Sequence, residues 1–222
     1  MADLTLVIGN KAYSSWSLRP WLLLRESGIP FKEILIPLYQ PESPRRIREH
    51  SPSGRVPALV DGATTIWDSL AICEYVAERF PEARGWPEAP GDRAVARSVS
   101  AEMHSGFGAV RSELPMNVRG RRSGVTPSTA AQNEIDRILE IWRDCRKRFG
   151  AGGPFLFGRF GIADAMYAPV VTRFATYGVE LAGAERDYSE AVQALPSLKD
   201  WTKAARAEAA VITASERGTP LA

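Results

Sequence analysis

Hydrophobic residues in the first part of the chain come in short blocks that alternate between strand-like and helix-like spacing. The apolar run at residues 4–8 predicts a buried strand. Apolar positions in residues 18–24 recur at helical spacing and predict a helix that begins near Ser14 or Ser15. Residues 31–37 predict a second strand. We therefore expect a βαβ unit, whose crossover should be right-handed.

A hairpin and a helix are predicted next. Two β-prone segments, residues 57–60 and 63–67, flank Asp61-Gly62, a pair typical of a two-residue type I′ turn. An apolar stripe within residues 69–80 then predicts a helix. A thioredoxin-like sheet with helices on its faces fits this order of elements.

The pattern changes where proline and glycine concentrate, at residues 82–91, which we interpret as an interdomain linker. Beyond the linker the strand signal fades, and residues 135–142 fit the helical template. The predicted fold class is therefore α/β plus all-α. A thioredoxin-like domain is expected over residues 1–81 and an all-helical domain over residues 92–222. The basic run at residues 119–122 is interpreted as a solvated loop.

Composition narrows the class of protein. The 222 residues include 28 basic and 26 acidic side chains, a formal net charge of +2, which gives no general attraction to nucleic acid or to an anionic membrane. No apolar stretch approaches the ~20 residues of a membrane span, and no leader segment is recognised. The two cysteines, Cys73 and Cys145, form no Cys-x-x-Cys and suit a reducing compartment, so we expect a cytoplasmic protein. Its scattered histidines and cysteines match no metal-ligand spacing, so no metal is expected.

The first candidate site is the turn from the first strand to the first helix, where Tyr13, Ser14 and Ser15 follow one another. Hydroxyls beside the free N–H groups of a helix end form an anion site. Hydrogen bonds to a bound thiolate would lower the thiol's pKa, and a fall from about 8.5 to about 6.5 requires ~2.7 kcal/mol. The alternative is that these serines only cap the helix.

Two further candidates surround the predicted hairpin. A cis Pro57 would turn the backbone groups of Val56 outward, where they can pair with an extended peptide-like ligand; the alternative is an ordinary trans proline. Asp68 and Ser69, at the start of the next helix, suit the ammonium and carboxylate of an α-amino acid head group. The alternative is plain N-capping.

In this order the motifs resemble those of the glutathione transferase family. Residues 54–59 (Gly-Arg-Val-Pro-Ala-Leu) and residues 68–75 (Asp-Ser-Leu-Ala-Ile-Cys-Glu-Tyr) are similar to the family's glutathione-binding signature. The resemblance implies that Val56, before a cis Pro57, pairs with the cysteinyl backbone of glutathione. The glutathione-binding residues that it implies are Gln40, Arg55, Val56, Pro57, Asp68 and Ser69.

Residues 14–19 are similar to the serine motif of zeta-like members, with Trp16 where that motif has cysteine. The resemblance implies Ser14 as the group that stabilises the thiolate, with Ser15 and Tyr13 as alternatives. It also implies that the first helix of the second domain lines the electrophile pocket, although a core or surface role is an equal alternative for each of its residues. The pocket residues that it implies are Met103, His104, Phe107 and Arg111.

The resemblance implies an enzyme for detoxification, in which the glutathione thiolate is conjugated to a small hydrophobic electrophile. A homodimer is expected from the family, with no metal and no nucleic-acid or membrane partner. Two alternatives remain open: a glutathione-dependent isomerase (maleylacetoacetate isomerase-like) or peroxidase on the same site, and a non-enzymatic binding module.

Overall fold

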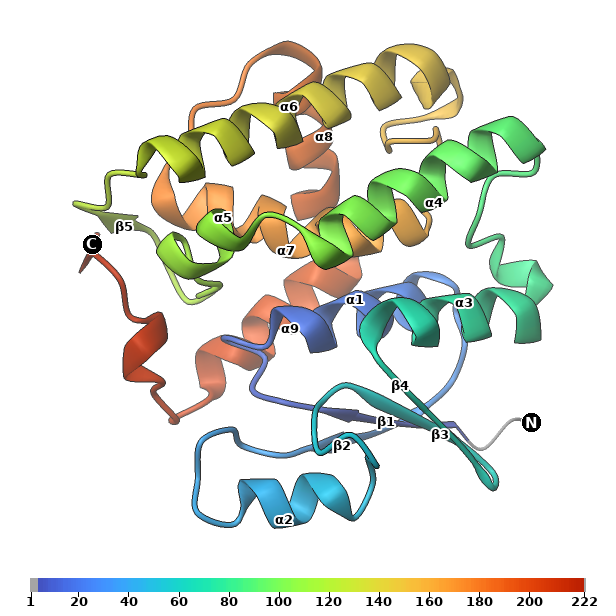
Figure 1. The fold of residues 1–222 in the computed structure, drawn as a ribbon, viewed down its shortest axis with the longest axis vertical. Helices are drawn as coiled ribbons and strands as arrows, with labels where there is room; N and C mark the ends of the chain where they lie inside the picture. The colour runs from blue at the N-terminus through green and yellow to red at the C-terminus, as the bar shows by residue number, and fades with distance from the viewer. Residues whose placement is uncertain (1–3, 222) are drawn as a thin grey trace.

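The computed structural model describes residues 4–221, which form a mixed sheet with helices on both faces and a larger group of helices beside it (Figure 1). The sheet has four strands in the order β2-β1-β3-β4. β1 pairs with β2 in parallel and with β3 antiparallel, and β3 pairs with β4 antiparallel. The strands are β1 (Leu4–Ile8), β2 (Lys32–Leu35), β3 (Ala58–Asp61) and β4 (Thr64–Trp67).

Helices cover both faces of this sheet because β1 is apolar on both. Leu6 and Ile8 face the main core, which includes α1 (Ser15–Glu26) and α3 (Ser69–Arg79). Val7 joins a smaller cluster under α2 (Ser43–Arg48), on the opposite face in Figure 1. The expected thioredoxin-like N-terminal domain is thus confirmed.

The hairpin is present, but its predicted turn is wrong. Asp61 pairs with Thr64, so the turn residues are Gly62 and Ala63. Of these two, only Gly62 has a positive φ, +57°, whereas a type I′ turn requires positive φ at both central residues. Asp61 stays in the ladder, and its carboxylate accepts a hydrogen bond from the Tyr75 hydroxyl at 2.9 Å.

The C-terminal domain is helical, as expected. The hydrophobic pattern missed α5 and α8, because α5 is very short and α8 carries mostly polar residues. The described helices are α4 (Pro90–Ser105), α5 (Gly108–Glu113), α6 (Thr129–Phe149), α7 (Ile162–Tyr177), α8 (Gly183–Ala194) and α9 (Pro196–Ala207). Short 3-10 turns lie at Pro81–Ala83, Gly150–Gly152 and Thr213–Ser215.

The central helix α7 is buried along almost its whole length and packs against α1 and α4. Its start is held by Asp164, whose Oδ2 accepts from the Gly161 N–H at 2.9 Å and whose Oδ1 accepts from the Leu156 N–H at 3.0 Å. Burial raises the pKa of Asp164 to about 7. Because α7 contacts α1 directly, side chains from its middle turns reach the N-terminal domain.

The end of the chain returns to the predicted loop at residues 119–122. There β5 (Arg122–Ser123) pairs antiparallel with β6 (Thr219–Pro220). The segment between α9 and β6 therefore runs past the start of α1, as the red end of the ribbon shows in Figure 1.

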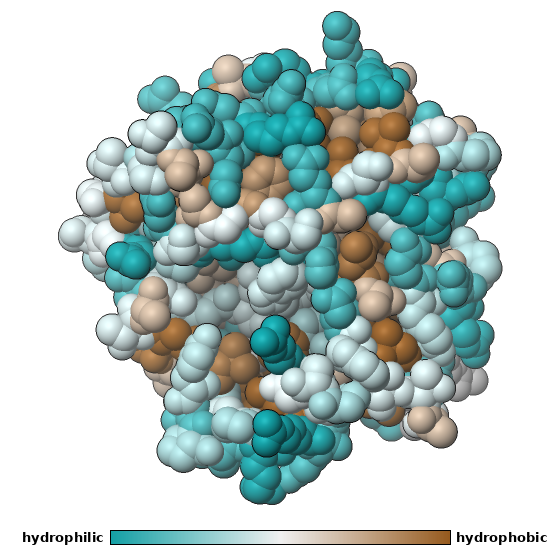
Figure 2. Space-filling view, in the orientation of Figure 1, coloured by the Kyte–Doolittle hydropathy of each residue, from teal (hydrophilic) through white to brown (hydrophobic). Residues whose placement is uncertain are grey.

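Surface and interior differ as expected for a globular chain. The face drawn in Figure 2 is mostly hydrophilic or neutral, with apolar residues in small separate groups. Inside, Cys73 and Cys145 are free thiols, 0% and 1% exposed, and burial raises the pKa of each. Within residues 4–221, no helix is long and apolar enough to cross a membrane. The same residues contain no group of three or more His, Cys, Asp or Glu side chains placed to hold a metal ion.

Candidate functional site

A cavity of about 270 Å³ lies at the amino end of α1, between the two domains. Six parts of the chain meet there. They are the start of α1, the loop before α2, the loop before β3, the segment that carries Arg111, the helix that carries Arg173, and the segment after α9. The lining residues are Tyr13, Ser14, Ser15, Trp16, Leu38, Tyr39, Val56, Arg111, Pro115, Met116, Arg173, Ile212 and Ser215.

All three predicted hydroxyls line this cavity, and each is less than 10% exposed. Ser14 occupies the N-cap position of α1 but makes no side-chain capping bond; its Oγ donates to Ser17 Oγ at 2.8 Å. The Tyr13 hydroxyl donates to Glu216 Oε1 at 2.5 Å. Ser15 Oγ accepts from Arg173 Nη2 at 3.2 Å. Of the three, Ser15 alone therefore has a hydroxyl proton that no described protein group accepts.

The predicted glutathione-binding residues are divided between the cavity and its surroundings. Val56 lines the cavity and the Val56–Pro57 peptide bond is cis. Gln40 and Arg55 are exposed, Pro57 is buried, and these three residues are not part of the cavity lining.

Asp68 and Ser69 lie at the start of α3, outside the cavity lining. Asp68 is the N-cap residue of α3, and its Oδ1 accepts from the N–H groups of Leu70 and Ala71 at 2.9 and 3.2 Å. Its other oxygen lies 2.7 Å from His104 Nε2. Ser69 is 1% exposed, and its Oγ accepts from Arg19 Nη1 at 3.3 Å.

Of the four residues predicted for the electrophile pocket, Arg111 lines the cavity. Met103 is 1% exposed in the core of α4, and Phe107, in the left-handed region at φ +60°, is 7% exposed. His104 contacts Asp68 and packs edge-on against Trp16, with ring centroids 5.4 Å apart. These three residues surround the cavity lining rather than form it.

Sequence reasoning missed Arg173 and Arg19, which form with Arg111 what we call the arginine cluster. Arg19 and Arg111 both lie over the Trp16 ring, with Cζ 4.3 and 4.7 Å from its centroid. Arg19 is 0% exposed and Arg173 is 4% exposed. Burial first, and then neighbouring guanidiniums, lowers the pKa of Arg19 and of Arg173 to about 9. An arginine within the apolar stretch of a buried helix was the available signal for Arg173.

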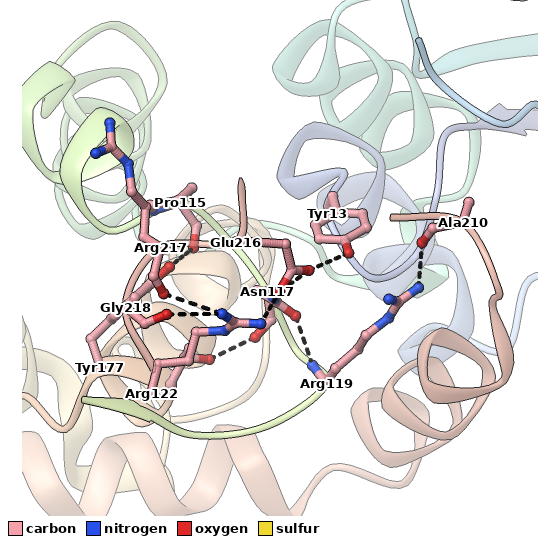
Figure 3. Close-up of polar contacts among 11 residues, drawn as sticks. Tyr13, Pro115, Asn117, Arg119, Arg122, Tyr177, Ala210, Glu216, Arg217 and Gly218 are labelled. Atoms are coloured by element: carbon pink, nitrogen blue, oxygen red, sulfur yellow. Dashed lines mark hydrogen bonds and ion pairs between the residues drawn. The ribbon is translucent and has the colours of Figure 1, made fainter. Parts of the chain in front are cut away.

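A second group of charged and polar residues beside the cavity is the tail cluster, which comprises Tyr13, Asn117, Arg122 and Glu216 (Figure 3). Glu216 accepts from the Tyr13 hydroxyl and from Asn117 Nδ2 at 3.0 Å, and it forms an ion pair with Arg122. The neighbouring Arg119 Nη2 donates to the Glu208 carbonyl at 2.7 Å. The predicted solvated loop is therefore wrong, because these arginines hold the C-terminal segment over the start of α1.

Known proteins resemble this chain over both of its domains. Residues 13–79 match the family description "Glutathione S-transferase, N-terminal domain", and residues 100–204 match "Glutathione S-transferase, C-terminal domain".

Two curated relatives carry names that describe different kinds of protein. A probable maleylacetoacetate isomerase of Caenorhabditis elegans is 34% identical over 93 residues, which is 42% of this chain and 42% of that protein. The aligned region thus spans less than half of that relative's length. A stringent starvation protein A homolog of Pasteurella multocida is 26% identical over 164 residues, which is 73% of this chain and 72% of that protein.

The structural comparison gives a glutathione-bound neighbour. The crystal structure of a glutathione transferase homolog from Burkholderia GL BGR1, with bound glutathione, has a TM-score of 0.69 and 25% sequence identity. The match covers 93% of this chain and 100% of that one.

Proposed function

The chain belongs to the glutathione S-transferase family, and from that membership we propose that it conjugates the glutathione thiolate to a small electrophile. The observation that supports this reaction is the cavity at the amino end of α1. There Tyr13, Ser14 and Ser15 lie on one side, and Val56, before its cis peptide bond, lies on another. The glutathione-bound neighbour supports the choice of cosubstrate.

We further propose that Ser15 is the main donor to the thiolate, with Ser14 and Tyr13 as the alternatives. Ser14 and Tyr13 already donate to Ser17 and Glu216. Ser15 accepts from a guanidinium, and a hydroxyl that accepts a charge-assisted bond becomes a stronger donor. The amino end of α1 adds a favourable dipole for the same negative charge.

The remaining glutathione contacts follow the family resemblance. Val56 would pair with the cysteinyl backbone, and Ser69, with Asp68, would receive the γ-glutamyl group. Gln40 and Arg55 would meet the glycine carboxylate. Family membership also leads us to propose that the chain forms a homodimer, lies in the cytoplasm and acts in detoxification. Sedimentation velocity would test the dimer, and cell fractionation would test the location.

The experiment that tests the mechanism compares Ser15→Ala with Ser14→Ala as a matched control. If Ser15 lowers the thiol's pKa from about 8.5 to about 6.5, Ser15→Ala lowers turnover with chlorodinitrobenzene by ~20-fold at about pH 7 and by less than ~2-fold at about pH 9. Glutathione affinity by calorimetry at about pH 7 falls by only ~4-fold, since the tripeptide backbone contacts remain and only the preference for the thiolate is lost.

The outcomes separate the candidate donors. A pH-dependent loss in Ser14→Ala alone would assign the role to Ser14. Unchanged turnover in both variants and in Tyr13→Phe would reject a hydroxyl-stabilised thiolate altogether.

Two other functions are each favoured by one relative. The isomerase relative supports a glutathione-dependent isomerization on the same site, which a substrate panel would reveal. The stringent starvation protein A relative supports a non-enzymatic binding module. If the protein is such a non-enzymatic module, we expect calorimetry to detect no heat of glutathione binding.

A further inference from the structure

A second cavity, of about 480 Å³, lies among α7, α8, α9 and the loop at residues 118–121, and we call it the α9 pocket. It shares no lining residue with the cavity at the amino end of α1. The two cavities meet different faces of α7, because Thr172 and Thr176 line the α9 pocket whereas Arg173 lines the other. Its volume is in the range of small-molecule sites, ~300–1,000 Å³.

The charged residues of the α9 pocket all have the same sign. Its cations are Arg121, from the loop, and Lys199, Lys203 and Arg206, which follow one face of α9. Among the described residues that line this pocket, none is acidic. Like charges that surround a hollow add their potentials there, so the α9 pocket attracts anions.

These cations are not neutralised by the chain. Within residues 4–221, the four side chains take part in no hydrogen bond or ion pair. The acidic residues in and after α9 are engaged elsewhere. Asp200 pairs with Arg25 at 3.3 Å, and Glu208 accepts from the N–H groups of Lys11 and Ala12 at 2.6 and 3.0 Å. The positive charge of the pocket is therefore available to an anion from solution.

The spacing of the cations suits an anion with more than one charged group. Lys199 and Arg206 are seven residues apart on α9, which is ~10 Å along the helix axis, and Lys203 lies between them. Lysine binds a phosphate as a point charge, and arginine adds paired donors that match its oxygens. Two phosphoryl groups can therefore be bound at once along this helix.

The polar groups opposite α9 offer acceptors rather than donors. The Thr172 hydroxyl donates to the Pro169 carbonyl, and the Thr176 hydroxyl donates to the Asn117 carbonyl, both at 2.8 Å. The side-chain nitrogen of Gln193 donates within α8 at 3.1 and 3.3 Å. Because these donors are already used, what remains for a ligand is oxygen lone pairs. Such acceptors suit a ligand body that carries hydroxyl groups.

We propose that the α9 pocket binds a small phosphate ester that has at least two negative charges and a hydroxyl-bearing body, as in a nucleoside diphosphate or a sugar bisphosphate. Its phosphoryl groups pair with the cations of α9, and its hydroxyls donate to the threonine oxygens of α7. Val118 and Leu198 supply the adjoining apolar surface. The inference does not rest on the proposed function, because the two cavities are separate.

The test is calorimetric titration of the full chain, without magnesium, with ADP and with fructose 1,6-bisphosphate. Adenosine, fructose and inorganic pyrophosphate are the matched fragments. We expect at least one of the two esters to bind ~10-fold or more tightly than its uncharged fragment, and more tightly than pyrophosphate. Tighter binding of ADP would assign the ligand to nucleotides, and tighter binding of the bisphosphate would assign it to sugar phosphates.

Two substitutions locate the binding. Lys203→Met removes an exposed cation of the α9 pocket, and we expect it to weaken the preferred ester by ~5-fold or more. Lys147→Met, at an exposed lysine of α6, makes the same change of charge outside the pocket and should alter this affinity by less than ~2-fold. Thr172→Val keeps the side-chain shape and should weaken the ester by ~3-fold while pyrophosphate is unaffected.

Several results would overturn the site. One is that neither ester binds at millimolar concentration, and another is that Lys203→Met and Lys147→Met weaken binding equally. Pyrophosphate that binds as tightly as both esters would also overturn it, because the hydroxyl acceptors would then contribute nothing. A single-stranded oligonucleotide that binds as tightly as the esters, at equal phosphate concentration, would show a general polyanion surface instead.

Discussion

The tail cluster and the arginine cluster border the same cavity, but the charges of the first are paired within the chain and those of the second are not. In the tail cluster, Glu216 faces Arg122 and accepts two further hydrogen bonds, so its charge is matched within the chain. In the arginine cluster, Arg111 and Arg173 meet only neutral acceptors. Matched charge indicates a structural role, whereas unmatched charge in a cavity indicates a place for a ligand.

The largest expected effect comes from removing the counter-ion of Arg122 in the tail cluster. Glu216→Gln leaves Arg122 partly buried without its counter-ion, so we expect the free energy of unfolding to fall by ~2 kcal/mol in urea titrations. Glu140→Gln, which removes an exposed carboxylate of α6, is the matched control and should cost less than ~0.5 kcal/mol.

A double substitution tests whether the loss comes from unbalanced charge. Adding Arg122→Met to Glu216→Gln should recover part of the stability, because no unpaired cation then remains. A double variant at least as unstable as the sum of the two single variants would contradict this account.

Asp164 extends the comparison to a buried acid whose hydrogen bonds are satisfied. Its pKa is raised to about 7, so the folded protein holds this proton more tightly than the unfolded chain does. Between about pH 4 and about pH 7 the folded state binds more protons, so raising the pH through this window lowers the free energy of unfolding, by up to ~1.3 kcal/mol per unit.

Urea titrations across that window compare the wild type with Asp164→Asn. The substituted chain starts from lower stability, because the two N–H groups donate to different oxygens of Asp164 and asparagine places an NH2 donor where one of these acceptors was. The wild-type advantage over Asp164→Asn should shrink as the pH rises. An advantage that grows with pH would show that the two backbone N–H groups outweigh burial and hold the pKa low.

The smallest expected effect comes from the arginine cluster, whose charges are not paired within the chain. Arg173→Met removes a buried cation and its repulsion with Arg111, and it loses only the hydrogen bonds to Pro169 and Ser15. We expect the free energy of unfolding of the ligand-free protein to change by less than ~0.5 kcal/mol. A fall in the free energy of unfolding as large as that in Glu216→Gln would mean that the arginine cluster stabilises the fold. The two clusters would then not differ in their roles.

Local sequence signals predicted those parts of the molecule whose determinants are close together in the chain. The order of strands and helices along the N-terminal domain and the fold class follow from short apolar runs and turn signals. Ser14, Ser15 and Val56 were found because they belong to short motifs of the N-terminal domain. The turn at Gly62 was misplaced by one residue because the Asp61 side chain is held by Tyr75, a contact that turn preferences ignore.

The remaining parts of the site depend on contacts between distant segments. Arg173 reaches Ser15 across 158 positions, and Glu216 reaches Tyr13 across 203. Neither pair has a spacing that a single sequence can reveal, since each exists only after α7 and the C-terminal segment have packed. The predicted solvated loop was wrong for the same reason, because the strand that pairs with Arg122 comes from the far end of the chain.

The state of the two cysteines has a consequence for a chain proposed to handle electrophiles. Both thiols are almost fully enclosed and have raised pKa values, so at neutral pH neither offers an accessible thiolate. A reactive compound that enters the cavity would thus encounter the sulfur of the bound tripeptide rather than one belonging to the polypeptide. Such a catalyst would resist alkylation by its own substrates over many turnovers.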